Sequence, residues 1–214
     1  MSGELPPRLA PLSKRVDEWL KHLLDLILSG VGLVLISPLM LILSLIVRLD
    51  SPGPFIHRRR VMGRGGTQFD AFKFRTMVVN GEEILKASPE LYALWLRDQK
   101  LKDDPRITRS GRWMRQLSLD ELPQLVNVLR GQMSLVGPRM FAPVESVRYG
   151  DSLAEILSVR PGIAGLWQVS GRSDLTYEDR ARLDIEYVRT RTIWLDLKLL
   201  FLTFWVVFKR KGAY

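Results

Sequence analysis

Two uncharged apolar stretches, one near each end of the chain, dominate the pattern of hydrophobic and polar positions. The longer one covers residues 26–47 and reads LILSGVGLVLISPLMLILSLIV. Its 22 residues would form a helix of about 33 Å, which is long enough to span the apolar core of a bilayer. The stretch is too long for a removable signal peptide, and it has no small-x-small cleavage site before the charges that follow.

The charges around this stretch do not give it a single orientation. Basic residues flank it on both sides: Lys14, Arg15 and Lys21 before it, and Arg48, Arg58, Arg59 and Arg60 after it. The positive-inside rule therefore draws both flanks to the cytoplasm, which a segment that enters and leaves on one face would satisfy. Ser37 and Pro38 at its middle predict a kink, because proline lacks an N–H and the serine hydroxyl can satisfy a freed carbonyl. A re-entrant segment and a spanning helix with a tolerated proline remain equal alternatives on these residues alone.

The shorter apolar stretch, residues 199–208, is too short to span a bilayer. Trp194 precedes this stretch, Trp205 lies within it, and the basic run 209–211 follows it. This pattern is typical of a helix that lies at the level of the lipid headgroups. A buried core helix of the soluble part is the alternative.

Between the two stretches the chain alternates short elements with turns. Residues 69–77 predict a half-buried strand, with Phe72 and Phe74 on one face and a cationic pair, Lys73 and Arg75, on the other. Such a pair is able to bind a phosphate, although a solvated strand face is the favoured explanation of the pair taken alone. Residues 82–101 predict one helix, and the apolar spacing from Leu122 predicts another that stops at Gly131.

Composition narrows the classes of function. Lysine and arginine number 32 against 23 acidic residues, a net charge of +9, which indicates anionic partners such as nucleic acid, lipid surfaces or phosphorylated substrates. The chain contains no cysteine, which excludes disulfides and thiol chemistry. Its two histidines, His22 and His57, are far apart, which argues against a histidine metal cluster or a Ser-His-Asp triad.

A pair of adjacent carboxylates, Asp120 and Glu121, stands out against this basic background. A structural role explains the pair by itself, because Ser118-x-x-Glu121 has the spacing of a capping box. Asp120 as the N-cap residue of the following helix is a second possibility, and acidic residues also suit the positive end of a helix dipole.

The surrounding arginines favour a chemical role for the same pair. Five cations and two anions lie between Lys102 and Arg115, and more arginines occur in turn-rich stretches such as SLVGPRM and QVSGR. A carboxylate among arginines stays ionised and is able to attack phosphorus or to bind Mg²⁺. Phosphoryl transfer uses this set of groups: cations, a hard metal ion and a positioned oxygen nucleophile.

Several motifs resemble one family closely. KFRTM, DPRITRSGRWMRQLSLDELPQLVNVLRGQMSLVGPR and RPGIAGLWQVSGR are similar to the bacterial sugar transferases, the monotopic polyprenyl-phosphate phosphoglycosyl transferases. The resemblance extends over roughly residues 14–210, with Ser37-Pro38 and SPGP matching the family's membrane segment. It is to the short members without an extra transmembrane bundle, and KLKDDPRI and GLWQVSGR are most similar to the hexose-1-phosphate branch.

The resemblance implies a fold and an organisation. The fold expected is α+β and mostly helical: a monotopic membrane protein with a re-entrant helix-break-helix hairpin and interfacial amphipathic helices around a small cytosolic catalytic domain. The domains expected are a flexible tail (1–13), the hairpin (14–49), the catalytic domain (50–193) and a C-terminal interfacial helix packed on that domain (194–214). The protein is expected in the bacterial inner membrane, with its catalytic domain on the cytoplasmic face.

The resemblance also implies a reaction. A sugar-1-phosphate passes from a UDP-sugar to undecaprenyl phosphate with release of UMP, as the first membrane step of exopolysaccharide, O-antigen or other glycoconjugate synthesis. The reaction is ping-pong, uses Mg²⁺, and passes through a phosphosugar on Asp120. A homodimer is compatible with the family, although the sequence carries no interface signature.

The site residues implied by matching motif positions are few. Asp120 and Glu121 are the catalytic pair, with Glu121 also binding the metal, and Ser37 and Pro38 break the membrane hairpin. Residues expected to contact the substrates are Lys73, Arg75, Arg115, Arg139, Gln168 and Arg172. The chain differs from the family pattern at three positions that concern the finer contacts of the site. Met140 stands where family members commonly have proline, and the stretch HRRRVMG differs around Arg59 and Val61.

Two other classes of protein compete with this interpretation. A membrane-anchored scaffold explains the charge and the apolar stretches, but leaves the set of Lys73, Asp120, Glu121 and Arg139 unexplained. A nucleic-acid-binding protein would use the arginines of residues 106–115 and bind duplexes in a salt-dependent way. The motifs favour the enzyme, and nucleic acid is not expected among its partners.

Overall fold

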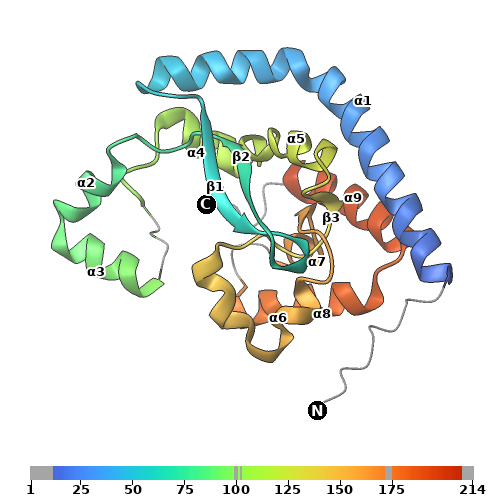
Figure 1. Ribbon diagram of the computed structural model, residues 1–214. Coiled ribbons are helices and arrows are strands. Elements are labelled where there is room, and N and C mark those ends of the chain that lie inside the picture. Colours follow the sequence, from blue (N-terminus) through green and yellow to red (C-terminus); the bar gives the residue numbers. More distant parts are fainter. Residues whose placement is uncertain (1–11, 99–100, 102, 172–174, 209–214) are drawn as a thin grey trace.

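The computed structural model describes residues 12–98, 101, 103–171 and 175–208. Most of these residues are helical, and the strands form two small two-stranded sheets. The mostly helical α+β class is confirmed. In Figure 1 one long helix, α1, curves around one side of a body that contains both sheets, and the pair α2–α3 projects from another side.

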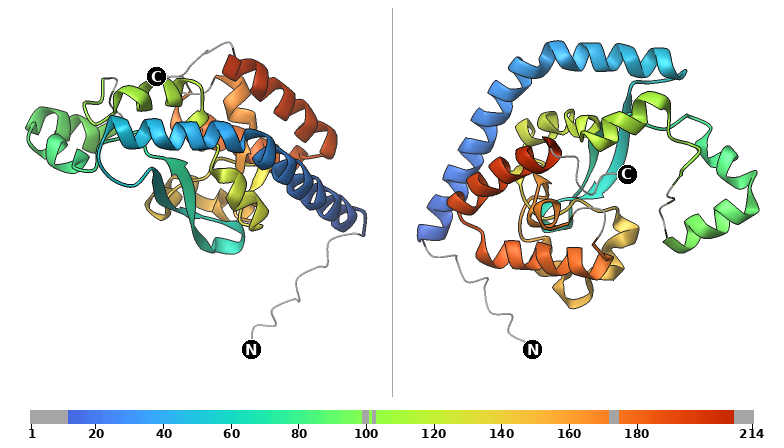
Figure 2. Two further views of the ribbon diagram at one scale, coloured as in Figure 1. Left: turned by 90° about the horizontal axis from the view of Figure 1, so that it is seen from above. Right: turned by 180° about the vertical axis from the view of Figure 1, so that it is seen from behind.

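Helix α1 (Leu12–Asp50) is a single helix with Pro38 inside it. Proline leaves the carbonyl of Val34 without its usual donor, and the Ser37 hydroxyl donates to that oxygen at 2.8 Å. This confirms the predicted role of the serine. The chain does not turn back on itself here, so the predicted hairpin is instead a bend between two arms of a continuous helix, as Figures 1 and 2 show.

The outer side of α1 is an exposed apolar surface. Val34 and Leu35 are each 74% exposed, Leu41 is 72% exposed and Leu49 is 78% exposed. Soluble proteins rarely leave so continuous an apolar face in water. The stretch Asp17–Asp50 is long and apolar enough to cross a membrane by length and composition.

The inner side of α1 packs on α5 (Gln124–Leu129). Gly30 and Gly32 of α1 face Leu129 and Leu125, and a methyl group at either glycine would lie at an ordinary van der Waals distance from these side chains. The C-terminal end of α1 is tied to α4 (Arg109–Gln116), because the carboxylate of Asp50 accepts hydrogen bonds from the Ser110 N–H at 2.8 Å and the Ser110 hydroxyl at 2.7 Å.

Strands β1 (Ile56–Met62) and β2 (Gln68–Phe74) form an antiparallel hairpin across η1 (Arg64–Gly66). The predicted strand is confirmed, although it ends at Phe74. The free edge of β2 is covered by Asn127 of α5, whose amide accepts from the Phe72 N–H at 3.0 Å and donates to the Asp70 carbonyl at 2.8 Å. The hairpin is thereby fixed to the helix that follows the carboxylate pair.

The prediction of one helix over residues 82–101 is wrong. The chain forms α2 (Gly81–Lys86) and α3 (Pro89–Asp98), because Pro89 disfavours the helical conformation in the residue before it. The predicted stop at Gly131 is confirmed. Gly131 has φ +70°, its N–H bonds the Val128 carbonyl, and the Gln132 N–H bonds the Asn127 carbonyl, which is a Schellman motif.

The second half of the chain surrounds a parallel pair, β3 (Ser134–Val136) and β4 (Gly162–Ala164). Between these strands lie η3 (Pro143–Ser152) and α6 (Leu153–Ile156), and after them come α7 (Leu166–Ser170), α8 (Tyr177–Thr190) and α9 (Ile193–Phe208). The last helix is buried along one side and exposed along the other, so the alternative of a fully buried core helix is wrong. Leu199 is buried against β3 and α8, whereas Trp194 and Phe201 are 81% and 72% exposed.

Candidate active site

The backbone conformation before the carboxylate pair is unusual. Ser118 has φ +54° and ψ +22°, and among the described residues it is the one non-glycine residue with positive φ. This left-handed conformation costs free energy, and it turns the chain from α4 into the short helix η2 (Leu119–Glu121). Strained residues of this kind occur preferentially at functional sites.

Neither predicted cap forms at this point. Ser118 makes no side-chain cap, and the Glu121 carboxylate bonds a lysine on β2 instead of the backbone before it. Asp120 lies inside η2, and α5 begins after Pro123, so Asp120 is not its N-cap. The carboxylates are therefore not explained by helix capping.

Asp120 is buried, with 8% of its surface exposed. Burial, and then the neighbouring charge of Glu121, raise the pKa of this carboxyl group to about 6 against the opposing charges of Lys73 and Arg115. Both cations therefore lie close enough to act on Asp120. A carboxylate that has lost its hydration but retains cationic neighbours is suited to nucleophilic attack at neutral pH.

Glu121 and Lys73 form an ion pair of 2.5 Å. Lys73 projects from the end of β2, and His57 lies opposite it across the hairpin. Loss of hydration, followed by the charges of Lys73 and Arg59, holds the pKa of His57 below its ordinary value, so its imidazole is neutral at pH 7. A row of polar side chains therefore begins at the dyad of Asp120 and Glu121 and continues along β1.

Arg115 lies in the last turn of α4, five residues before Asp120. It lowers the pKa of Asp120 and also that of Asp104, which forms its own ion pair with Arg106 at 2.6 Å. The structure thus brings together four residues that the sequence placed in the site: Lys73, Arg115, Asp120 and Glu121.

Arg139 lies in a second cluster, which the hairpin connects to the first. Arg59, two residues along β1 from His57, donates to Glu145 at 2.7 Å. The other oxygen of Glu145 is 3.9 Å from Arg139. The row therefore runs from Lys73 past His57 and Arg59 to Glu145 and Arg139.

The position of Arg139 is fixed from its backbone. Its N–H donates to Asp184 of α8 at 2.9 Å, and it forms a bridge with Gly162. Its guanidinium lies 5.8 Å from the ring centre of Trp167 and 5.9 Å from that of Tyr177. Burial raises the pKa of Asp184 to about 7, against the opposing effect of the Arg139 N–H and charge.

Gln168 is not joined to Asp120 and Glu121 by any contact among the described residues. The Gln168 amide nitrogen donates to the Ile163 carbonyl at 2.5 Å, and its amide oxygen is buried without a hydrogen-bond partner in the described part of the chain. Gln168 belongs to α7, on the Arg139 side. Arg172 lies outside the described residues.

Arg75 does not extend into the site with Lys73, contrary to the alternation predicted for a strand. The strand ends at Phe74, and the guanidinium of Arg75 turns toward the end of α1. It donates to the Pro52 carbonyl at 2.7 Å and to the Ser51 carbonyl at 2.6 Å, and only 6% of the residue is exposed. These bonds close the C-terminal end of α1, so Arg75 has a structural role here.

Sequence reasoning missed three residues of the two clusters: His57, Glu145 and Asp184. The sequence suggested His57 only as a metal ligand or a triad member and argued against both, but the hairpin register places it beside Lys73. The pairing of Glu145 with Arg59 spans 86 residues, and no local signal announces it. Val61 and Met140, two positions at which this chain differs from the family pattern, are buried in the same core cluster with Phe69.

The dyad fits a magnesium ion that is held mainly by substrate. The described residues contain no group of three or more His, Asp or Glu side chains able to hold a metal. Mg²⁺ commonly takes only one or two carboxylates and completes its shell with phosphates and water. Two adjacent carboxylates, whose mutual repulsion raises the pKa of one, supply such a partial shell.

The comparisons with known proteins place these residues in a family. The model of the family described as "Bacterial sugar transferase" matches residues 16–210. The chain is 47% identical over 207 residues to the undecaprenyl-phosphate galactose phosphotransferase of Salmonella typhimurium, covering 95% of this chain and 43% of that protein. It is 39% identical over 198 residues to the exopolysaccharide production protein ExoY of Rhizobium meliloti, covering 91% of this chain and 88% of that protein.

A third relative is the UDP-glucose:undecaprenyl-phosphate glucose-1-phosphate transferase of Escherichia coli, 37% identical over 213 residues, with 95% of this chain and 43% of that protein covered. The chain thus spans less than half the length of the Salmonella and Escherichia coli proteins. The family model, in contrast, covers most of the bent helix, both clusters and all of α9. This chain belongs to the bacterial sugar transferase family.

Proposed function

We propose that this chain transfers a sugar-1-phosphate from a UDP-sugar to undecaprenyl phosphate, with release of UMP, as a first membrane step of exopolysaccharide, O-antigen or other glycoconjugate synthesis. The observation that carries the proposal is the buried carboxylate of Asp120, which lies within electrostatic reach of Lys73 and Arg115. Relatives named as undecaprenyl-phosphate hexose phosphotransferases support the substrate class.

In the first step a carboxylate oxygen of Asp120 attacks the phosphorus that bears the sugar. The new bond is an acyl phosphate, the bond that breaks is the one between this phosphorus and the bridging oxygen of the diphosphate, and UMP leaves with the electron pair. Lys73 and Arg115 stabilise the charge that develops on the phosphoryl oxygens. Arg139, at the far end of the polar row, is suited to hold the second phosphate or the nucleotide.

In the second step a phosphate oxygen of undecaprenyl phosphate attacks the same phosphorus. The acyl phosphate breaks, the Asp120 carboxylate is regenerated, and the lipid leaves as a diphosphate carrying the sugar. Division into two displacements lets one cationic pocket serve both substrates in turn. Glu121 and Asp120 would hold Mg²⁺, which when bound supplies further neutralisation of phosphate charge.

The exposed surface of α1 supports a location of this chemistry at a bilayer. One substrate is soluble and the other is anchored in lipid, so the site must lie at the membrane surface. We propose that α1 dips into one leaflet of the bacterial inner membrane as a re-entrant segment and that α9 lies at the headgroups. The catalytic part then faces the cytoplasm, where basic residues on both flanks of α1 attract anionic lipid.

Release of UMP from a panel of UDP-sugars tests the proposed function. The purified chain in detergent, supplied with undecaprenyl phosphate and Mg²⁺, is expected to release UMP from at least one UDP-hexose or N-acetylated UDP-hexose. Omission of Mg²⁺ is expected to suppress the release. Absence of UMP with every donor, by a preparation that remains folded, would show that the chain is a membrane scaffold.

The raised pKa of Asp120 predicts an acidic limb in the pH profile. We expect kcat/KM to fall as the pH drops through about 6, because protonation removes the nucleophile. Replacing Lys73 by methionine removes a cation that lowers this pKa, and should move the limb upward by about one pH unit. Lys86→Met, at an exposed surface pair, is the matched control and should leave the limb unchanged. Identical profiles for the two variants would contradict the placement of Lys73.

Labelling of single cysteines tests the topology of α1. The chain contains no cysteine, so Asp17→Cys at one end of the helix and Gln68→Cys beyond the other end each introduce one reactive thiol. Both residues are exposed. A re-entrant helix predicts that a membrane-impermeant maleimide labels neither thiol in intact cells and both after permeabilisation. Labelling of one thiol alone in intact cells would mean that the helix crosses the bilayer.

A further inference from the structure

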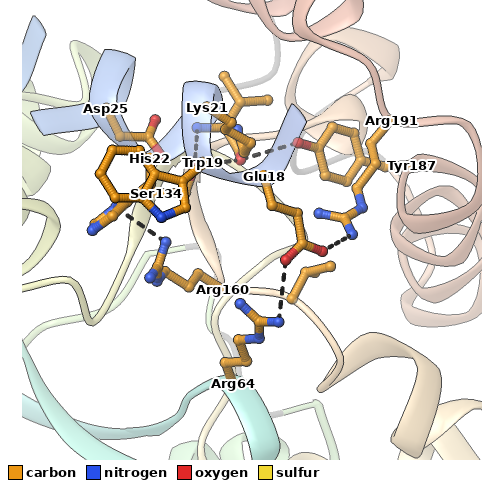
Figure 3. Close-up of a pocket in the computed structure, with 12 residues that line it drawn as sticks. Glu18, Trp19, Lys21, His22, Asp25, Arg64, Ser134, Arg160, Tyr187 and Arg191 are labelled. Carbon is orange, nitrogen blue, oxygen red and sulfur yellow. Dashed lines mark hydrogen bonds and ion pairs between the residues drawn. The ribbon is translucent and has the colours of Figure 1, made fainter. Parts of the chain in front are cut away.

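A polar cavity lies beside the N-terminal arm of α1. Its lining includes neither Asp120 nor Glu121. Its volume is about 260 Å³, and α1, η1, β3, the loop before β4 and the end of α8 line it (Figure 3). Pockets for organic ligands usually measure about 300–1,000 Å³. The cavity is therefore closer in size to a small anionic group than to a nucleotide sugar.

The lining of this cavity carries surplus positive charge. Four cations, Lys21, Arg64, Arg160 and Arg191, stand against two lining carboxylates, Glu18 and Asp25, and against Asp196, which forms an ion pair with Lys21. Glu18 bridges two of the arginines, lying 2.7 Å from Arg191 and 3.3 Å from Arg64. Figure 3 shows these side chains directed toward a common space.

Within the part of the chain that the structure describes, Arg160 is the cation of this cavity that forms no ion pair. Among the described residues, its guanidinium has one hydrogen-bond partner, the Nδ1 atom of His22 at 3.1 Å. Arginine can only donate, so this ring nitrogen accepts and carries no proton. Burial, and then the charge of Arg64, lower the pKa of Arg160. A partly buried guanidinium beside a like charge is stabilised by an added anion.

The position of the cavity connects it to the membrane face. Trp19 contributes to the lining and is 75% exposed, and exposed leucines follow it along α1. A narrow apolar crease between α1 and α9 shares Lys21, Asp25 and Val136 with the cavity and is lined beyond them by Leu24, Leu28, Leu197 and Leu200. A polar cavity that adjoins an apolar crease matches a lipid, with a charged headgroup and a hydrocarbon chain.

We propose that this cavity binds the headgroup phosphate of an anionic phospholipid, with Arg160 as its principal donor and Arg64 and Arg191 beside it. The bound lipid would fix the N-terminal arm of α1 at the headgroup level. This site is separate from the dyad, and its existence does not require the proposed transfer reaction. Glu18 occupies part of the cationic surface and competes with the phosphate.

Native mass spectrometry of the full chain tests the proposal. The protein is equilibrated in mixed micelles containing equal amounts of phosphatidylcholine and phosphatidylglycerol, and retained lipids are counted. We expect preferential retention of phosphatidylglycerol. Arg160→Gln should weaken that retention about tenfold, the loss expected for a charge-assisted hydrogen bond. Arg182→Gln, at an exposed pair on α8, removes the same charge and should retain the lipid as the unaltered chain does.

A second variant keeps the test independent of folding. Glu18→Gln frees Arg64 and Arg191, so it should tighten retention of phosphatidylglycerol roughly fivefold. Equal retention by the Arg160 and Arg182 variants, or weaker retention by the Glu18 variant, would overturn the proposal. Displacement of the lipid by inorganic phosphate would instead identify a site for free phosphate, and displacement by undecaprenyl phosphate a site for the lipid substrate. UMP release measured in parallel separates these outcomes from failure of the proposed function.

Discussion

Asp120→Asn is expected to reduce UMP release by at least about 10⁴-fold, because the amide cannot form the acyl phosphate. The residue is buried within electrostatic reach of Lys73 and Arg115, and the neighbouring carboxylate of Glu121 is engaged in an ion pair with Lys73. Mass spectrometry of enzyme quenched with donor alone should show the phosphosugar on the Asp120 peptide of the unaltered chain and on no peptide of the variant. Turnover by the variant at a normal rate would remove Asp120 from the mechanism.

The same substitution should make the protein more stable at neutral pH. The pKa of Asp120 is raised in the folded state, from 3.8 to about 6, so the folded state binds a proton more readily than the unfolded state. Stability contributed by this group is greatest below pH 4 and falls as the pH rises through 6. Asparagine avoids the cost of the ionised form, and the free energy of unfolding at pH 7.5 should rise by on the order of 2 kcal/mol.

Chemical unfolding in detergent micelles, at pH 7.5 and at pH 4, measures this effect. The difference between the variant and the unaltered chain should shrink at the lower pH, where Asp120 is largely protonated. Asp151→Asn, at an exposed position, is the matched control and should show no such dependence. An Asp120 variant that is less stable than the unaltered chain at pH 7.5 would mean that this carboxylate stabilises the fold.

Gly111→Ala is expected to destabilise the protein by about 3 kcal/mol, although alanine favours a helix more than glycine does. A methyl group at Gly111 would press on the backbone of Thr76, only 2.8 Å from its carbonyl carbon. The same carbonyl accepts the Thr108 N–H at 3.0 Å, which fixes the start of α4. Displacement of α4 also moves Arg115 and the dyad, so UMP release should fall together with stability.

Gly30→Ala provides the matched control for this effect. It is the same substitution within a helix, but the new methyl group would meet Leu129 at 3.9 Å, an ordinary van der Waals distance. We therefore expect a neutral or slightly stabilising change for Gly30→Ala in the same unfolding measurement. Similar losses for the two variants would show that helical glycines are sensitive for a reason other than contact with Thr76.

Local signals in the sequence determined much of this fold. The uncharged run and its proline predicted a long helix with a bend, since both depend only on neighbouring residues. Alternating side chains predicted the strand that carries Lys73, and Gly131 predicted the end of α5. Family motifs brought Asp120, Glu121, Lys73 and Arg115 into one site before any coordinates, and the structure places them together.

Contacts between distant segments decided the rest. Whether Arg75 follows Lys73 into the site depends on where β2 ends and on carbonyls of the turn after α1, which lie more than twenty residues away. The helix capping predicted for Ser118 and Glu121 failed because Lys73, on another element, competes for the Glu121 carboxylate. His57, Glu145 and Arg160 obtained their partners through strand register or through pairings across 86 and 138 residues. Electrostatic and hydrogen-bonding partners are set by proximity in space, and that proximity exists only once the chain has folded.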